Sequence, residues 1–262
     1  MRFKLLIIAT ALISLCFKAA NEPEFTVEKV VNYQPHTNEL KGDVSEAIAR
    51  YYAIRNSERI LIYETRTRYN VDGQITQYTT YRLVQNTDSS MLEKSARINY
   101  TYEKKKLVTY ESFSFTETGE VPDDSEKSVI RYSYSNAKKA SYKAYRYGEF
   151  DHSGEVVVLD NRHATETIKY KTSHIQPIIY QFEYNESLQR TRSIQKEIYQ
   201  GKEESDTTVF IYENGNVIQE TDKRLTQNYS YEFDKKGNWT KRLTKLRATE
   251  LVGDIEREII YR

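Results

Sequence analysis

Residues 233–239 read Phe-Asp-Lys-Lys-Gly-Asn-Trp: an apolar residue, three others, then glycine, a polar residue and a second apolar residue. Glycine adopts the positive φ angles that tight turns need, and aromatic and β-branched residues favour the strands on either side. The spacing predicts a β-hairpin, and it recurs along the chain. Its five copies begin at Tyr69, Phe115, Phe150, Ile211 and Phe233, with glycines at Gly73, Gly119, Gly154, Gly215 and Gly237.

The segments between these turns alternate apolar and polar residues, which is the pattern of half-buried strands. Twenty-three tyrosines, with nine phenylalanines and one tryptophan, supply the aromatic side chains. We therefore predict an all-β fold, an antiparallel meander of successive hairpins with roughly ten to fourteen strands in an extended, curved sheet. The alternative is a closed or half-open up-and-down barrel, which would hide the sheet edges and could enclose an apolar ligand.

The first twenty residues have the form of a secretory signal peptide. Arg2 and Lys4 precede an apolar run, residues 5–15, that is too short to cross a bilayer. An alternative is lipidation of Cys16, which residues 13–15 (Ile-Ser-Leu) precede in the place of a lipobox. We therefore expect an exported protein of the periplasm or cell surface, with a lipid anchor at Cys16 as the second possibility.

Composition limits the remaining possibilities. Cys16 is the only cysteine, so a chain cleaved after it would contain no disulfide, and loss of the leader leaves a net charge of about −2. This balance predicts no nucleic-acid partner, and no later segment is apolar enough to form a transmembrane helix. Residues 21–41 are expected to be a flexible lead-in, and residues 42–262 a single hairpin-repeat domain.

The C-terminal part carries a resemblance to a known repeat. Tyr231-Glu232-Phe233-Asp234-Lys235-Lys236-Gly237-Asn238-Trp239 resembles the YD repeat of Rhs-type proteins. The chain is also similar to a group of exported Bacteroidetes-type proteins that begin with a Leu-Lys-Gly-x-Val strand, here residues 40–44, and end on an Arg-Glu-Ile-x-Tyr strand, here residues 257–261. The resemblance is sharp over about the last thirty residues. It implies a hairpin-repeat fold, an exported location and a strand from Val44, but no catalytic residues.

The Tyr-x-Tyr pairs are the candidate binding surface. Residues two apart on a strand point to the same face, so each pair places two rings side by side. The rings could form the core, or they could form a platform on which a glycan or an extended peptide stacks. The candidate ligand-binding residues are Tyr100, Tyr102, Tyr132, Tyr134, Tyr145, Tyr147 and Trp239.

Catalytic and metal-binding signatures are missing from the sequence. The four histidines are scattered, and no nucleophile elbow, P-loop or EF-hand loop occurs. We therefore expect no enzyme, metal or cofactor. The predicted function is a non-catalytic binding or scaffold module of the cell envelope that presents a tyrosine-rich face to a glycan, a peptide or an envelope protein. The alternative is a carrier that holds an apolar ligand or lipoprotein in an enclosed β-cavity.

Overall fold

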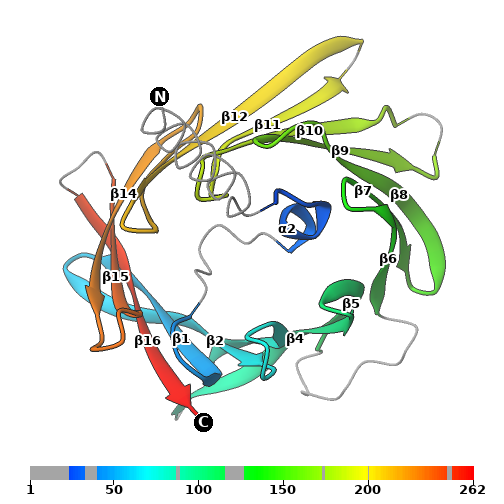
Figure 1. The fold of residues 1–262 in the computed structure, drawn as a ribbon. Helices are drawn as coiled ribbons and strands as arrows, with labels where there is room; N and C mark the ends of the chain where they lie inside the picture. The colour runs from blue at the N-terminus through cyan, green and yellow to red at the C-terminus, as the bar shows by residue number, and fades with distance from the viewer. Residues whose placement is uncertain are drawn as a thin grey trace, which may run out of the picture.

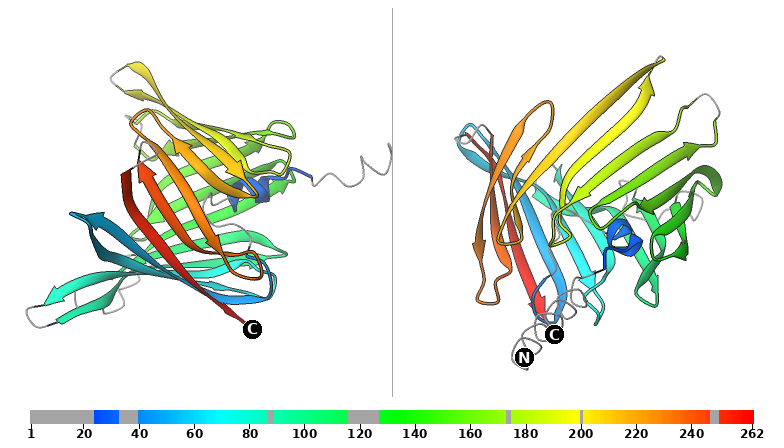
Figure 2. Two further views of the ribbon diagram at one scale, coloured as in Figure 1. Left: turned by 90° about the vertical axis from the view of Figure 1, so that its left-hand side faces the viewer. Right: turned by 45° about the horizontal axis from the view of Figure 1, so that its top comes forward.

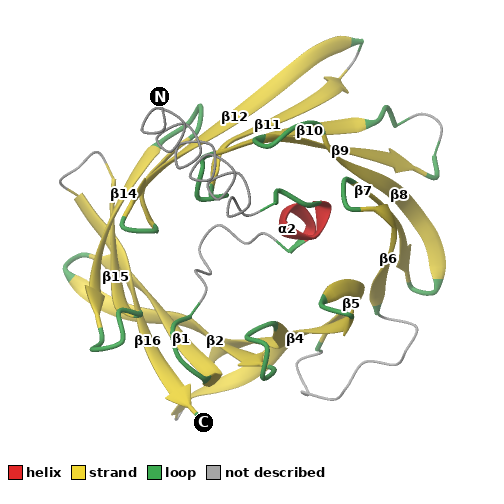
Figure 3. Cartoon of the chain, in the orientation of Figure 1, coloured by secondary structure: helices red, strands yellow, loops and turns green. Residues whose placement is uncertain are grey.

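The computed structural model describes residues 24–32, 40–86, 89–115, 127–172, 175–199, 201–246 and 250–262. Within these ranges, sixteen antiparallel strands follow one another around a closed barrel, and the last strand pairs with the first (Figure 1). A short helix, α2 (Val27–Val31), lies inside the ring of strands (Figure 3). The strands are β1 (Val44–Arg55), β2 (Glu58–Tyr69), β3 (Ile75–Asn86), β4 (Ser89–Glu103), β5 (Lys106–Ser114), β6 (Ser128–Asn136), β7 (Lys139–Arg146), β8 (Glu149–Val158), β9 (His163–Tyr170), β10 (Ile178–Tyr184), β11 (Arg190–Tyr199), β12 (Lys202–Glu213), β13 (Asn216–Thr221), β14 (Thr226–Phe233), β15 (Trp239–Leu246) and β16 (Glu250–Tyr261).

The predicted antiparallel meander of hairpins is confirmed, and the barrel is closed, as in the alternative to the open sheet. The predicted strand from Val44 is β1. The sixteen strands exceed the expected ten to fourteen. β12 begins at Lys202, well before the apolar residues near its end. Polar residues between Lys202 and Thr208 give no alternating pattern, yet they pair in register with β11. No helix in the described ranges is long and apolar enough to cross a bilayer.

Three of the five predicted glycine turns are hairpin turns. Gly73, Gly215 and Gly237 have φ angles of 76°, 84° and 79°. The prediction is wrong at Gly154, which lies within β8 directly opposite Tyr142 on β7. A Cβ atom at Gly154 would overlap the Tyr142 ring, so this glycine makes room for an aromatic side chain and not for a turn. The copy at Gly119 lies outside the described residues.

Side chains tie neighbouring hairpins together at the end of the barrel where α2 lies. The amide of Gln74, in the β2–β3 turn, donates to the Lys105 carbonyl in the β4–β5 turn at 2.8 Å. Asn238, in the β14–β15 turn, accepts from the Lys41 N–H at 2.6 Å and donates to the Lys41 carbonyl at 2.9 Å. These bonds tie the β2–β3 turn to the β4–β5 turn, and the β14–β15 turn to the residues that precede β1.

The two faces of the barrel wall differ in chemistry. Because α2 lies within the ring, the side chains that pack against it, such as Tyr142 and Val156, mark the inner face. Side chains alternate between the two faces along a strand, and directly paired residues on neighbouring strands lie on the same face. The strand registers therefore tell which residues of every other strand point inward. The inner face carries most of the tyrosines, whereas Lys143, Ser153 and Lys169 point outward from the neighbouring positions.

The outer face is held together by cross-strand ion pairs. Arg50 on β1 and Arg66 on β2 each donate from Nε to Glu64 at 2.9 Å, and the Glu64 side chain is only 2% exposed. Arg59 on β2 binds Asp254 with both ends of its guanidinium, at 3.0 and 2.7 Å. Bidentate charged hydrogen bonds of this kind are stronger than neutral ones. At the end away from α2, the β3–β4 and β11–β12 hairpins extend beyond their neighbours (Figure 2).

Candidate functional site

The inner wall of the barrel is lined with aromatic side chains from most of its strands. Starting from Tyr142, the registers place these residues on one continuous inner face. We call this face the aromatic wall. Its aromatic members include Tyr51, Tyr63, Tyr78, Tyr100, Tyr102, Tyr110, Tyr132, Tyr134, Tyr142, Tyr180, Phe182, Tyr184, Tyr229, Tyr231 and Trp239.

Four of the predicted site residues lie together on this wall. Tyr100 packs edge-on against Tyr110 with ring centroids 5.5 Å apart, and Tyr132 packs against Tyr142 at 5.4 Å. The Tyr134 hydroxyl donates to the Leu107 carbonyl at 2.9 Å, across the neighbouring hairpin. Burial raises the pKa of Tyr102 to about 12. The rings therefore expose their faces and edges inward while their hydroxyls stay protonated.

Two other predicted residues lie elsewhere. Tyr145 points outward from β7, because it sits one residue along from the inward Ala144 and pairs across a bulge with Phe150. Tyr147 is in the β7–β8 turn with a φ of 54°, and it is 63% exposed. The Tyr145 and Tyr147 rings therefore share no face with Tyr132 and Tyr134, which corrects the predicted platform at these two positions.

Trp239 belongs to the aromatic wall, but on β15, distant from β4 and β6. It contacts Tyr231 at 6.0 Å and packs with Ala49 and Ile255. The Arg257 guanidinium lies 3.6 Å above the indole ring and donates from Nε to the Trp239 carbonyl at 2.9 Å. Burial lowers the pKa of Arg257 to about 10. Arg257 on β16 thus places a cation against Trp239 on β15, and the residues of the predicted platform are divided between two regions of the wall.

A segment of the chain itself covers one part of the aromatic wall. Phe25 lies 4.6 Å from Tyr184, and Val27 and Val30 are buried against β7, β8, β9 and β10. The Val27 N–H donates to the Ala137 carbonyl at 2.8 Å. Residues 24–32 were expected to belong to a flexible lead-in, yet they pack as a short turn of helix. We call residues 24–32 the inner segment.

A charged contact fixes the orientation of the inner segment. Glu28 forms an ion pair with Lys106 at 2.7 Å. Burial alone would raise the pKa of Glu28, but hydrogen bonds from Lys106, Thr26 and the backbone, together with the charge of Lys106, hold the pKa below its ordinary value. The sequence signal for this segment was the helical spacing of Val27, Val30 and Val31, which places all three on one face.

The chemistry of this site is stacking and hydrogen bonding. The Tyr142 hydroxyl donates to Glu166 at 2.7 Å, and the Tyr231 hydroxyl donates to the Val217 carbonyl at 2.6 Å. Within the described ranges, no three histidine or acidic side chains gather as metal ligands would. The arrangement can hold a guest with apolar, aromatic and hydrogen-bonding groups. Cys16 lies outside the described residues.

No family model matches the sequence, and no curated protein matches it either. A porin-like protein from Bacteroides uniformis aligns over 84% of this chain and 99% of its own, at 12% identity and a TM-score of 0.40. A porin-like protein from Bacteroides vulgatus aligns over 85% and 99%, at 10% identity and the same TM-score. The Tc holotoxin pore of Photorhabdus luminescens aligns over 81% of this chain and 15% of its own, at 10% identity and a TM-score of 0.23.

Proposed function

We propose that this protein is a non-catalytic binding protein of the cell envelope that holds a polypeptide guest against the aromatic inner wall of its barrel. The inner segment is the observation that carries the proposal. It is a peptide seated on that wall through ring contacts from Phe25, aliphatic contacts from Val27 and Val30, and a main-chain hydrogen bond to Ala137. These are the contacts that any apolar peptide would need.

The wall continues beyond the part that the inner segment covers. Tyr51 and Tyr63 stack at 4.1 Å on β1 and β2 and remain partly exposed, whereas Tyr142, beneath the inner segment, is 6% exposed. A barrel of sixteen strands is too wide for its own side chains to fill. Partly exposed inward rings therefore offer further peptide-binding surface of the same chemistry.

The outer face supports a location in an aqueous compartment of the envelope. A barrel wall set in lipid carries apolar residues outward, and each Arg or Lys at the middle of such a wall costs about 2–4 kcal/mol. Here Arg50, Arg66, Lys143 and Lys169 point outward, and the apolar cluster points inward. We expect residues 21–262 to remain in the aqueous phase of a detergent–water partition. Recovery in the detergent phase would contradict this placement.

The closed barrel also supports the second predicted function, a carrier of apolar ligands. The cluster of Val156, Val158 and Ala164 favours it, since these side chains form an apolar patch on the inner wall. Glu166 and Arg257 face the same interior, however, and their charges suit a peptide better than an acyl chain. The polypeptide guest is therefore the first choice.

The test is binding of the inner segment in trans. A fluorescent peptide, Glu-Phe-Thr-Val-Glu-Lys-Val-Val-Asn (residues 24–32), is titrated into the full chain carrying Phe25→Ser and Val30→Ser, and anisotropy is measured. We expect saturable binding to this variant, and much weaker binding to the unaltered chain, whose own segment competes. A Val71→Ser variant, altered at an 83% exposed turn residue, should behave as the unaltered chain.

Two outcomes would overturn the proposal. The first is a folded Phe25→Ser/Val30→Ser variant, by circular dichroism, that binds no peptide. The second is a variant that binds a fluorescent fatty acid and is indifferent to the peptide, which would establish the carrier instead.

A further inference from the structure

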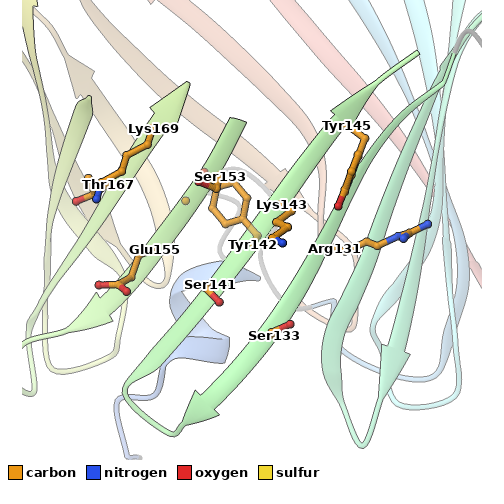
Figure 4. A pocket seen from close by; sticks show the side chains of 11 residues that line it. Arg131, Ser133, Ser141, Tyr142, Lys143, Tyr145, Ser153, Glu155, Thr167 and Lys169 are labelled. Atoms are coloured by element: carbon orange, nitrogen blue, oxygen red, sulfur yellow. The ribbon is translucent and has the colours of Figure 1, made fainter. Parts of the chain in front are cut away.

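We infer a second binding site, on the outer face of the barrel, that takes an acidic glycan. A groove of about 610 Å³ crosses β6, β7, β8 and β9. Figure 4 views these strands with α2 behind them, so the labelled side chains that reach toward the viewer belong to the outer face. The volume falls within the range of ordinary ligand sites. Its charged and hydroxyl side chains lie on the opposite side of the wall from the inner segment, and Tyr142 and Gly154 complete its lining.

Three cations and a hydroxyl form one straight row across the groove. Arg131 on β6 is directly opposite Lys143 on β7, Lys143 is opposite Ser153 on β8, and Ser153 is opposite Lys169 on β9. Neighbouring strands lie about 4.8 Å apart, so the row spans roughly 14 Å. We call these four residues the cation row. Its length suits several units of a chain-like ligand better than a single small anion.

In the part of the chain that the structure describes, no carboxylate forms an ion pair with the cation row. Like charges directly opposite each other on a sheet are destabilising. Arg131 and Lys143 are the one directly opposed pair of cations among the registered strand pairs of the described residues. Within the same residues, Lys143 and Lys169 make no ion pair. The one acid of the groove, Glu155, is held by Lys139 at 2.6 Å.

Elsewhere on the outer face, directly opposed charges are complementary. Arg50 faces Glu64 across β1 and β2, and Lys241 faces Glu232 across β14 and β15. The groove therefore departs from the charge pattern of the rest of the wall. A bound anion would remove the unfavourable Arg131–Lys143 contact, which is the physical reason to expect a negatively charged ligand.

The second row of the groove points to a ligand rich in hydroxyls. Ser133, Ser141, Glu155 and Thr167 lie opposite one another on the same four strands. These side chains line the groove, and each offers a hydrogen-bond acceptor, with a donor at the three hydroxyls. An acyl chain would need an apolar floor here. A sugar chain needs hydroxyl partners of this kind.

Tyr145 supplies the aromatic contact that sugar rings use. It lies at the side of the groove, and the Arg131 guanidinium is 5.6 Å from its ring centroid. Sugar C–H groups pack on aromatic faces, and the cation beside the ring would pair with a uronate carboxylate. Cations, hydroxyls and one aromatic face together match an acidic glycan.

The test is calorimetric titration of the full chain with an oligogalacturonate of defined length, with a neutral maltooligosaccharide as the comparison. We expect binding of the acidic oligosaccharide alone, weakening as salt is added. Lys143→Ser with Lys169→Ser should weaken it roughly five- to thirtyfold, because two exposed ionic contacts are lost. The matched control is Lys235→Ser with Lys245→Ser, which removes the same charge from the β14–β16 side and should leave binding unchanged.

Equal weakening of oligogalacturonate binding in both double variants would overturn the site. It would show that binding depends on the net charge of the protein and not on the position of the two lysines. Absence of oligogalacturonate binding to the folded, unaltered chain would overturn it as well. Binding of anionic phospholipid vesicles through Lys143 and Lys169, with no binding of the oligosaccharide, would replace the glycan with a lipid headgroup. Peptide binding to the inner wall should be the same in all these variants.

Discussion

Truncation of Phe25 to alanine should release the inner segment without unfolding the barrel. The Phe25 ring is 4% exposed and lies 4.6 Å from Tyr184. Removal of a buried phenylalanine ring costs about 3–5 kcal/mol. The inner segment is not part of the strand ladder, so the loss falls on its docking equilibrium and not on the barrel. At about 3 kcal/mol, the docking constant falls by roughly a hundredfold.

Amide hydrogen exchange measures this release directly. The Val27 N–H bonds to the Ala137 carbonyl and the Asn32 N–H bonds to the Glu28 carbonyl, so both are protected while the segment is docked. In Phe25→Ala these amides should exchange roughly a hundred times faster, while the amides of β7 and β8 keep their protection. Val71→Ala serves as the control. Unchanged exchange at Val27, or an equal loss of protection in the strands, would refute a separately docked segment.

Three further predictions concern the wall. Gly154→Ala should destabilise the barrel by about 1–3 kcal/mol in thermal unfolding, because a Cβ there overlaps the Tyr142 ring, whereas Ser153→Ala on the other face should change little. Stability to urea should fall as pH rises from 10 to 12: burial raises the pKa of Tyr69 to about 12 from 10.0, so its contribution is complete below pH 10 and is lost as the folded state ionises. A flat urea midpoint over that range would contradict this. Glu64→Ala should cost about 1–3 kcal/mol in urea unfolding, because two partly exposed arginines lose their shared buried carboxylate, and no change would show that the pairs contribute little.

Turns were predictable from the sequence where they depend only on the φ preferences of the turn residues themselves. Asn214 and Gly215 have φ angles of 50° and 84°, which an Asn-Gly pair adopts readily. Gly154 carries the same local pattern, but its role is set by Tyr142 on the neighbouring strand. The spacing of residues along the chain does not show that the Tyr142 ring lies opposite Gly154 on the neighbouring strand. Tyr147 shows the converse case: Gly148, with a φ of 78°, marks the turn in the sequence, but the residue type of Tyr147 does not predict its own φ of 54°.

The sequence predicted that tyrosines form the candidate site, but it did not predict that these tyrosines line the inside of a barrel. The period of two along β6 correctly put Tyr132 and Tyr134 on one face. Whether that face is flat or the inside of a barrel depends on the pairing of β1 with β16, which local patterns do not encode. The outer groove was equally hidden, because the opposition of Arg131 and Lys143 depends on the register between two strands. The sequence shows that Phe25 and Val27 are apolar, but it does not show which part of the barrel wall they pack against.

The closing pair of strands has a kinetic consequence. The Ser45 hydroxyl on β1 donates to the Ile260 carbonyl on β16, 215 residues away in sequence. In a chain made from its N-terminus, β1 can pair with β2 early, but its other edge stays open until β16 arrives. Contacts of such sequence separation form slowly, and an open edge can recruit a strand from another molecule. Refolding yield should therefore fall with protein concentration, because ring closure competes with assembly between copies.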